Sequence, residues 1–227
     1  MNQKVLEAIG NDEGGMITLG GFGGYVVVGF DHTIKNKKGY RDFRVLGNAF
    51  YSNANPDPNA PKGGSAEPGI IMVAYDRNHN GKPDENEWYE IAGSSYTDCK
   101  NEAWYDKAVA AGNDVNTYHN YEYIRWKDNQ GGGGYKEKNA FHKQSYYPKW
   151  VTADKLTFKG TCLPQNGIDE SGKGTYYVCY TFLYGYADNE LNASEDSAID
   201  IDWAVDANGN KVHLPGVDFI KIYTGVN

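Results

Sequence analysis

Oxygen-bearing side chains recur at regular positions in the segment 75–88, which reads YDRNHNGKPDENEW. Counted from its first aspartate, they occupy positions one, three, five, nine and twelve, and position seven offers a backbone carbonyl. This is the ligand spacing of a twelve-residue calcium loop, with the expected glycine, Gly81, at position six for the sharp turn. The predicted ligands of a calcium ion are Asp76, Asn78, Asn80, Lys82, Asp84 and Glu87. The alternative is a polar surface turn that binds no ion.

The residues on either side of this loop favour strands rather than helices. Residues 70–75 form an apolar, largely β-branched run, and residues 88–91 alternate between large apolar and polar side chains. Pro83 inside the loop is also atypical of an EF-hand. We therefore expect a structural calcium ion that stiffens a connection between two strands, and not a calcium sensor.

Composition and charge limit the partners of the chain. The 227 residues carry a formal net charge of −8, and anionic nucleic acid or membrane surfaces would repel such a protein unless it had a basic patch. The sequence contains no run of about 18 apolar residues, the length that a membrane-spanning helix needs. The 28 glycines suit turns between short strands, and the excess of tyrosine (19) over phenylalanine (8) suits wet aromatic surfaces as well as solvated sheet faces.

About ten short strand-like runs, separated by Gly-, Asn- and Asp-rich turns, fill the chain. They predict an all-β protein, a jelly-roll-like antiparallel β-sandwich with long loops and one short helix at 102–111. No linker-like break divides the sequence, so we expect a single domain over 1–227 with residues 1–15 as a lead-in. The glycine cluster at 20–24 precedes a Tyr-Val-Val-Val strand, which argues against a phosphate-binding turn before a helix.

Two hairpins are predicted in the second half of the chain. The first pairs residues 156–163 with 175–183, and it could place Cys162 opposite Cys179, close enough for a disulfide. The second pairs 198–205 with 217–223 around an Asn-Gly turn. Three cysteines without CxxC spacing exclude a zinc-finger interpretation and leave the redox compartment open.

No hydrolase, kinase, phosphate-loop or zinc-protease signature is present, so we do not expect an enzyme. Asp188 with Asp200 or Asp202 could form a glycosidase pair, but acidic residues are common in this chain and any pair is weak evidence. The same three aspartates could instead hold a second cation.

Six segments carry a resemblance to a known family: GGFGGYVVVGFDHTI, FRVLGNAF, EPGIIMVAYD, NEWYEIAGS, QSYYPKW and DIDWAVDANGNKVHLPGVDFIKIYT. Together they resemble the C-terminal globular domain of Bacteroidetes cell-surface lipoproteins, proteins often encoded beside outer-membrane vitamin-uptake systems. The resemblance implies binding rather than catalysis: capture of cobalamin (vitamin B12) at the cell surface and its transfer to a TonB-dependent transporter. A lipoprotein signal with its lipid-bearing cysteine is absent from this sequence, so outer-membrane anchoring is an expectation for a full-length protein.

The resemblance supplies no residue-level motif for ligand contacts. A corrin ring is large, flat and partly apolar, so aromatic side chains in Gly-rich loops are suitable contacts. The candidates are Trp104, Tyr105, Trp126, Tyr135, Tyr146, Tyr147 and Trp150. About half of these rings are expected in the core, Trp126 first among them because its strand alternates. A carbohydrate-binding module is the main alternative, because aromatic platforms suit sugars equally well; a glycoside-active enzyme and a purely structural module are the others.

Overall fold

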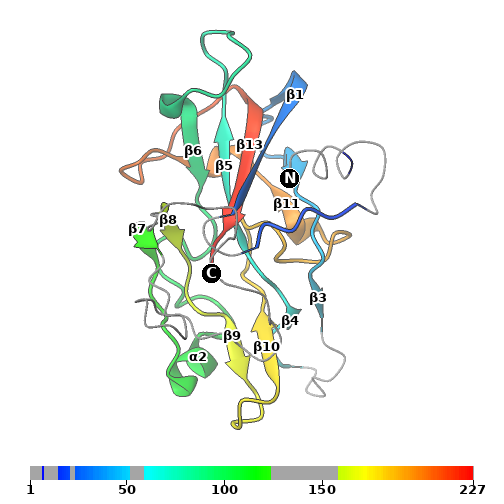
Figure 1. The fold of residues 1–227 in the computed structure, drawn as a ribbon, viewed down its shortest axis with the longest axis vertical. Helices are drawn as coiled ribbons and strands as arrows, with labels where there is room; N and C mark the ends of the chain where they lie inside the picture. Colours follow the sequence, from blue (N-terminus) through cyan, green and yellow to red (C-terminus); the bar gives the residue numbers. More distant parts are fainter. Residues whose placement is uncertain (1–6, 8–14, 21–23, 52–58, 124–157, 227) are drawn as a thin grey trace, which may run out of the picture.

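The computed structural model describes residues 7, 15–20, 24–51, 59–123 and 158–226. Within them the chain forms thirteen strands, a short α-helix and three 3-10 turns (Figure 1). The strands are β1 (Tyr25–Lys35), β2 (Phe43–Arg44), β3 (Phe50–Tyr51), β4 (Gly63–Ser65), β5 (Gly69–Ala74), β6 (Trp88–Ile91), β7 (Tyr118–Tyr123), β8 (Phe158–Cys162), β9 (Gly167–Asp169), β10 (Tyr177–Tyr180), β11 (Ala198–Ile199), β12 (Ala204–Val205) and β13 (Gly216–Thr224). The helix is α2 (Tyr105–Ala111), and the 3-10 turns are η1 (Glu85–Glu87), η2 (Glu195–Ser197) and η3 (Ile201–Trp203).

A five-stranded antiparallel sheet, in the order β1-β13-β5-β6-β12, organises the molecule. Its register places Val28 opposite Ile220 and Ile220 opposite Val73, so apolar side chains of three strands share one face. Successive side chains of a strand point to opposite faces. Ile70 and Ile71, neighbours on β5, are both fully buried and therefore belong to two different clusters.

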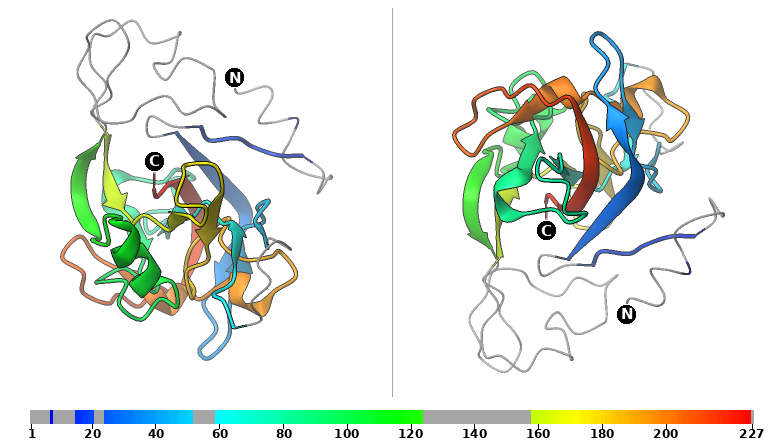
Figure 2. Two further views of the ribbon diagram at one scale, coloured as in Figure 1. Left: turned by 90° about the horizontal axis from the view of Figure 1, so that it is seen from below. Right: turned by 90° about the horizontal axis from the view of Figure 1, so that it is seen from above.

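The two clusters lie on opposite faces of this sheet. The first, which contains Ile71, Val73 and Ile220, is completed by residues of β11, η3 and the segment before β13. The second contains Ile70 together with Trp104 of the segment leading into α2 and with residues of β9 and β10. Those last two strands belong to a four-stranded sheet in the order β3-β4-β10-β9, and α2 contacts β9 (Figures 1 and 2). The prediction of an all-β protein is confirmed, while the jelly-roll strand order stays a prediction.

The helix is shorter than predicted but ends where the sequence indicated. It begins at Tyr105 rather than at residue 102 and is followed by Gly112 with φ of 77°. Only glycine adopts this left-handed conformation readily, so it stops the helix. In the described part of the chain, no helix is both long enough and apolar enough to cross a membrane.

Both predicted hairpins were wrong in their partners. β8 pairs with β7, and β10 pairs with β4 and β9, so residues 156–163 and 175–183 do not form a hairpin. Cys162 and Cys179 are accordingly not joined by a disulfide. Likewise β13 pairs with β1 and β5 instead of with residues 198–205.

The segment 198–205 is interrupted for a local reason. The Asp200 carboxylate accepts a hydrogen bond from the Asp202 backbone N–H at 2.9 Å and caps the 3-10 turn η3. A short acidic side chain competes in this way with strand hydrogen bonds. β11 and β12 are therefore two short strands, and they pair with β2 and β6 respectively. The predicted turn at Asn208-Gly209 is present, and an isolated bridge between Val205 and Lys211 closes it.

Candidate functional site

The segment 76–87 connects two adjacent antiparallel strands, β5 and β6, as the flanking residues predicted. It leaves β5 through Tyr75, coils around its own polar side chains and ends in η1 immediately before Trp88. Figure 1 shows it as the loop above these two strands. Because both strands lie inside the five-stranded sheet, the loop is held at each end by a buried element.

Asp76 organises the first half of the loop. Its side chain is only 8% exposed, and its carboxylate accepts hydrogen bonds from the backbone N–H of Asn80 at 3.0 Å and of Gly81 at 2.8 Å. Gly81 has φ of 73°, and nothing lies within 4 Å of the Cβ position that it lacks, so backbone conformation explains the glycine. The loop is thus coiled toward the residue at position one.

The amide side chains of the loop converge on Asp84. The Asn78 and Asn80 side-chain amides donate to the same oxygen of the Asp84 carboxylate, at 2.8 Å and 3.0 Å. Their carbonyl oxygens accept from backbone N–H groups, that of Asn78 from Asn80 and that of Asn80 from Lys82. Positions one, three, five and nine of the predicted ligand set therefore lie on one side of a single tight coil.

Glu87 closes the loop from its other end. Glu87 is 3% exposed, and its carboxylate accepts from the backbone N–H of Arg77 at 2.9 Å and of Asp84 at 3.1 Å. A buried carboxylate needs such donors or a cation, because burial without a partner is costly. The last predicted ligand is thereby brought back to the first residues of the loop.

Two residues outside the loop fix where it starts. The Asp218 carboxylate of β13 accepts from the Asp76 backbone N–H at 2.8 Å and from the Thr33 hydroxyl of β1 at 2.5 Å. The first loop residue is therefore tied to two strands of the sheet. The sequence offered no signal for this contact, because Asp218 lies far from the loop along the chain and looks like a solvent-facing residue of an alternating strand.

The loop carboxylates have no basic side chain as a partner in the described part of the chain. None of the salt bridges there involves Asp76, Asp84 or Glu87, and the Arg77 guanidinium turns instead to the Tyr89 hydroxyl. The described residues also contain no group of three or more His, Cys, Asp or Glu side chains placed to hold a metal. The three carboxylates of the predicted set, Asp76, Asp84 and Glu87, are therefore not gathered into such a group in this structure. The other predicted oxygens come from Asn78, Asn80 and Lys82.

The aromatic candidates are divided by the structure. Trp104 is fully buried, packs edge-on against Phe182 with ring centroids 5.1 Å apart, and donates its indole N–H to the Thr181 carbonyl at 2.9 Å. Trp104 is therefore a core residue, and its burial argues against the prediction that it contacts the ligand. Tyr105 is half-buried. The remaining five candidates lie outside the described residues: Trp126, Tyr135, Tyr146, Tyr147 and Trp150.

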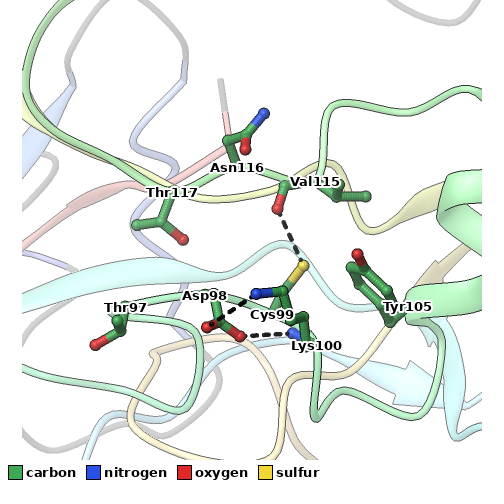
Figure 3. A pocket seen from close by; sticks show the side chains of 8 residues that line it. All are labelled: Thr97, Asp98, Cys99, Lys100, Tyr105, Val115, Asn116 and Thr117. Atoms are coloured by element: carbon green, nitrogen blue, oxygen red, sulfur yellow. Dashed lines mark hydrogen bonds and ion pairs between the residues drawn. The ribbon is translucent and has the colours of Figure 1, made fainter.

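Tyr105 lines a small polar depression of about 160 Å³ beside α2 (Figure 3). A drug-sized ligand needs roughly 300–1,000 Å³, so this depression is too small for a corrin ring. On its wall the Cys99 thiol donates to the Val115 carbonyl at 3.2 Å, and burial raises the pKa of Cys99 to about 11. At neutral pH this cysteine is a thiol and not a nucleophilic thiolate.

The three aspartates considered as an acid pair or a second cation site have separate structural partners. The Asp188 carboxylate accepts from the backbone N–H of Asn48 at 2.6 Å and of Ala49 at 2.8 Å. Asp200 caps η3, and Asp202 accepts from the Asn36 amide at 2.8 Å. Each carboxylate thus stabilises a different loop or turn.

Glu90 is a titratable group that the sequence did not single out. It is half-buried on β6, and its carboxylate accepts from the Thr161 hydroxyl of β8 at 2.6 Å. Burial raises the pKa of Glu90 to about 7, partly offset by this hydrogen bond. The raised pKa means that the folded protein binds this proton more tightly than the unfolded chain does, so stability falls as pH rises from about 4.5 to about 7.

Glu90→Gln is therefore expected to stabilise the protein at pH 8, by about 2 kcal/mol after allowance for partial exposure. Glutamine can still accept from Thr161 but carries no charge that burial penalises. Urea unfolding at pH 5 and pH 8 checks this, with Glu67→Gln at an exposed carboxylate as the control. Equal wild-type and Glu90→Gln stability at pH 8 would contradict it.

The described elements define an all-β protein of antiparallel sheets with a polar twelve-residue loop between two central strands. No protein-family model matches the chain, and the comparison with curated proteins finds no match either.

Proposed function

We propose that the chain is a non-catalytic ligand-binding domain whose loop 76–87 holds a structural calcium ion. The observation that carries the proposal is the inward coil of this loop, in which the Asp76 and Glu87 carboxylates are buried without a basic partner among the described residues. A divalent cation would supply the missing positive charge. Oxygen ligands alone, as here, are what calcium prefers.

The donor set fits calcium in kind and number. Asp76, Asp84 and Glu87 would supply carboxylates, Asn78 and Asn80 amide oxygens, and Lys82 its backbone carbonyl. When bound, the ion neutralises carboxylates that would otherwise repel one another. Because the loop joins two strands of the sheet, the consequence is a stiffer β5–β6 connection and not a signal.

For the ligand we propose cobalamin, captured at the cell surface and passed to a TonB-dependent outer-membrane transporter. The support is the family resemblance of the sequence and its supply of tyrosine and tryptophan, above all in the segment 124–157. Full-length protein would then be an outer-membrane-anchored lipoprotein. A carbohydrate-binding module of a glycan-utilisation protein is the alternative, since aromatic rings also stack on sugars.

Titration of the intrinsic tryptophan fluorescence with cyanocobalamin tests the proposal. The corrin absorbs strongly, so binding near any of the five tryptophans should quench emission in a saturable way, at micromolar or lower concentration. A matched inner-filter control separates binding from simple absorption. A flat titration confirmed by calorimetry would overturn the cobalamin assignment, and a positive glycan array would then favour the alternative. Recovery of unaltered ligand distinguishes capture from catalysis.

A further inference from the structure

One face of the five-stranded sheet carries two cross-strand rows of side chains that belong to neither core. The register places Val27, Lys221, Met72 and Glu90 side by side across β1, β13, β5 and β6. The next row along the strands is Gly29, Phe219, Ala74 and Trp88. Directly opposed residues on one face of a sheet are in contact distance, so these rows make one continuous surface.

This face is only partly covered by the described elements. The preceding row, Tyr25, Tyr223 and Ile70, passes under β8: the Tyr223 hydroxyl accepts from the Thr161 N–H at 2.9 Å. At the end of that row Tyr25 is 62% exposed. Beyond the row Val27 is 39% exposed, while Met72, Phe219 and Trp88 are half-buried. Figure 1 shows β8 next to the lower end of β6, so the paired strands β7 and β8 border the surface on one side.

Apolar and aromatic groups dominate this surface. The Phe219 ring lies across Gly29 so closely that a Cβ there would stand 2.9 Å from it. Ala74, in the same row, is fully buried between its larger neighbours. Flat rings and a methionine side chain offer stacking and adaptable contact to a planar ligand.

Lys221 is the charged group in the middle of this surface. Its ammonium lies 4.7 Å from the centroid of the Tyr25 ring and 5.9 Å from that of Tyr223. No carboxylate or other hydrogen-bond acceptor contacts it in the part of the chain that the structure describes. Burial lowers the pKa of Lys221, as expected for an ammonium that has given up water without gaining an anion. A half-buried cation that contacts two rings and, among the described residues, no acceptor is complementary to an anionic ligand.

We propose that the two rows around Lys221 form a binding site for a small planar, largely apolar molecule that carries an anionic group. Its ring system would lie on Phe219, Met72 and Trp88, and its anion would accept hydrogen bonds from the Lys221 ammonium. Charge-assisted bonds of this kind are among the stronger ones in proteins. The inference goes beyond the proposed function, because it uses neither calcium nor the loop aromatics; a failed cyanocobalamin titration would leave it intact.

Methionine methyl signals can report ligand binding at this site in the wild-type protein. The chain has three, at positions 1, 16 and 72, and Met72 sits between Lys221 and Glu90. With 13C-methyl methionine and 8-anilinonaphthalene-1-sulfonate as probe, we expect a saturable ring-current shift of one methyl signal, assigned to Met72 by its loss in Met72→Leu. An unmoved Met72 signal would overturn the proposal. That outcome would mean that the probe does not bind this face of the sheet, whether the face is bare or is covered by another part of the chain or by a second copy.

A charge variant tests the role of the ammonium. Lys221→Met keeps the apolar stem and should weaken binding of the sulfonate probe about tenfold or more. Lys35→Met, at an exposed lysine of the same sheet, should leave it unchanged. The uncharged analogue N-phenyl-1-naphthylamine should bind weakly and with equal affinity to wild type and Lys221→Met. Equal sulfonate affinity in wild type and Lys221→Met would overturn the assignment.

Discussion

Trp104→Ala is expected to destabilise the folded protein by about 3–5 kcal/mol, the range for removing a large aromatic side chain from a core. Trp104 is fully buried, and its ring packs against Phe182. The change also leaves the Thr181 carbonyl without the indole N–H that it accepts at 2.9 Å. Urea or thermal unfolding measures the loss.

The neighbouring Tyr105→Ala is the matched control. Because the Tyr105 ring is only half-buried, its removal should lower the free energy of unfolding by less than half as much as Trp104→Ala does. Trp104→Phe separates structure from binding: it fills most of the site, so it should fold, and its affinity for cyanocobalamin should equal that of wild type. A Trp104→Ala protein of wild-type stability, or a Trp104→Phe protein that folds but loses ligand, would return this residue to the candidate binding site.

Removal of calcium is expected to lower the melting temperature of the wild-type protein by about 5–10 °C. At a calcium concentration about 100 times the dissociation constant, binding to the folded state alone contributes about 2.7 kcal/mol. For a chain of this size each kcal/mol shifts the melting temperature by about 2–4 °C. Melts in EDTA, and again after calcium is restored in excess, measure the effect.

Variants of two acidic residues in η1 make the calcium test specific. Glu87→Gln removes the buried carboxylate at position twelve, so its melting temperature should not respond to calcium. Glu85→Gln removes an exposed carboxylate at a position that supplies no ligand, and it should respond as wild type does. An EDTA melt identical to the calcium melt in wild type would remove the calcium assignment, and an unchanged response in Glu87→Gln would remove the ligand assignment.

Local features of the fold were predictable because their signals lie within a few residues. The apolar run 70–75 and the alternating run 88–91 become β5 and β6, and the loop between them coils around Asp76 through hydrogen bonds to residues four and five positions later. Gly112 ends the helix through its own backbone conformation. In each case the types of a few neighbouring residues determine the local structure.

Pairing between distant strands was not predictable in the same way. The hairpin prediction for 198–205 with 217–223 relied on proximity and on the Asn-Gly turn, whereas Ile199 pairs with Phe43 and Ile220 with Val28 and Val73. Several apolar strands compete for each edge, and the choice among them depends on the whole core. The sequence also gave no means of separating Trp104, a core residue, from surface aromatics.

The place of β13 in the sheet has a consequence for how the chain folds. Residues 216–224 lie between β1 and β5, and Tyr25 pairs with Tyr223 across nearly 200 intervening residues. Until these residues have been synthesised, β1 has no sheet to join and one face of each core stays open. Such non-local pairing slows folding to the range of milliseconds to seconds. The five-stranded sheet can therefore close only after this segment has been synthesised, so the folding of both cores is completed late.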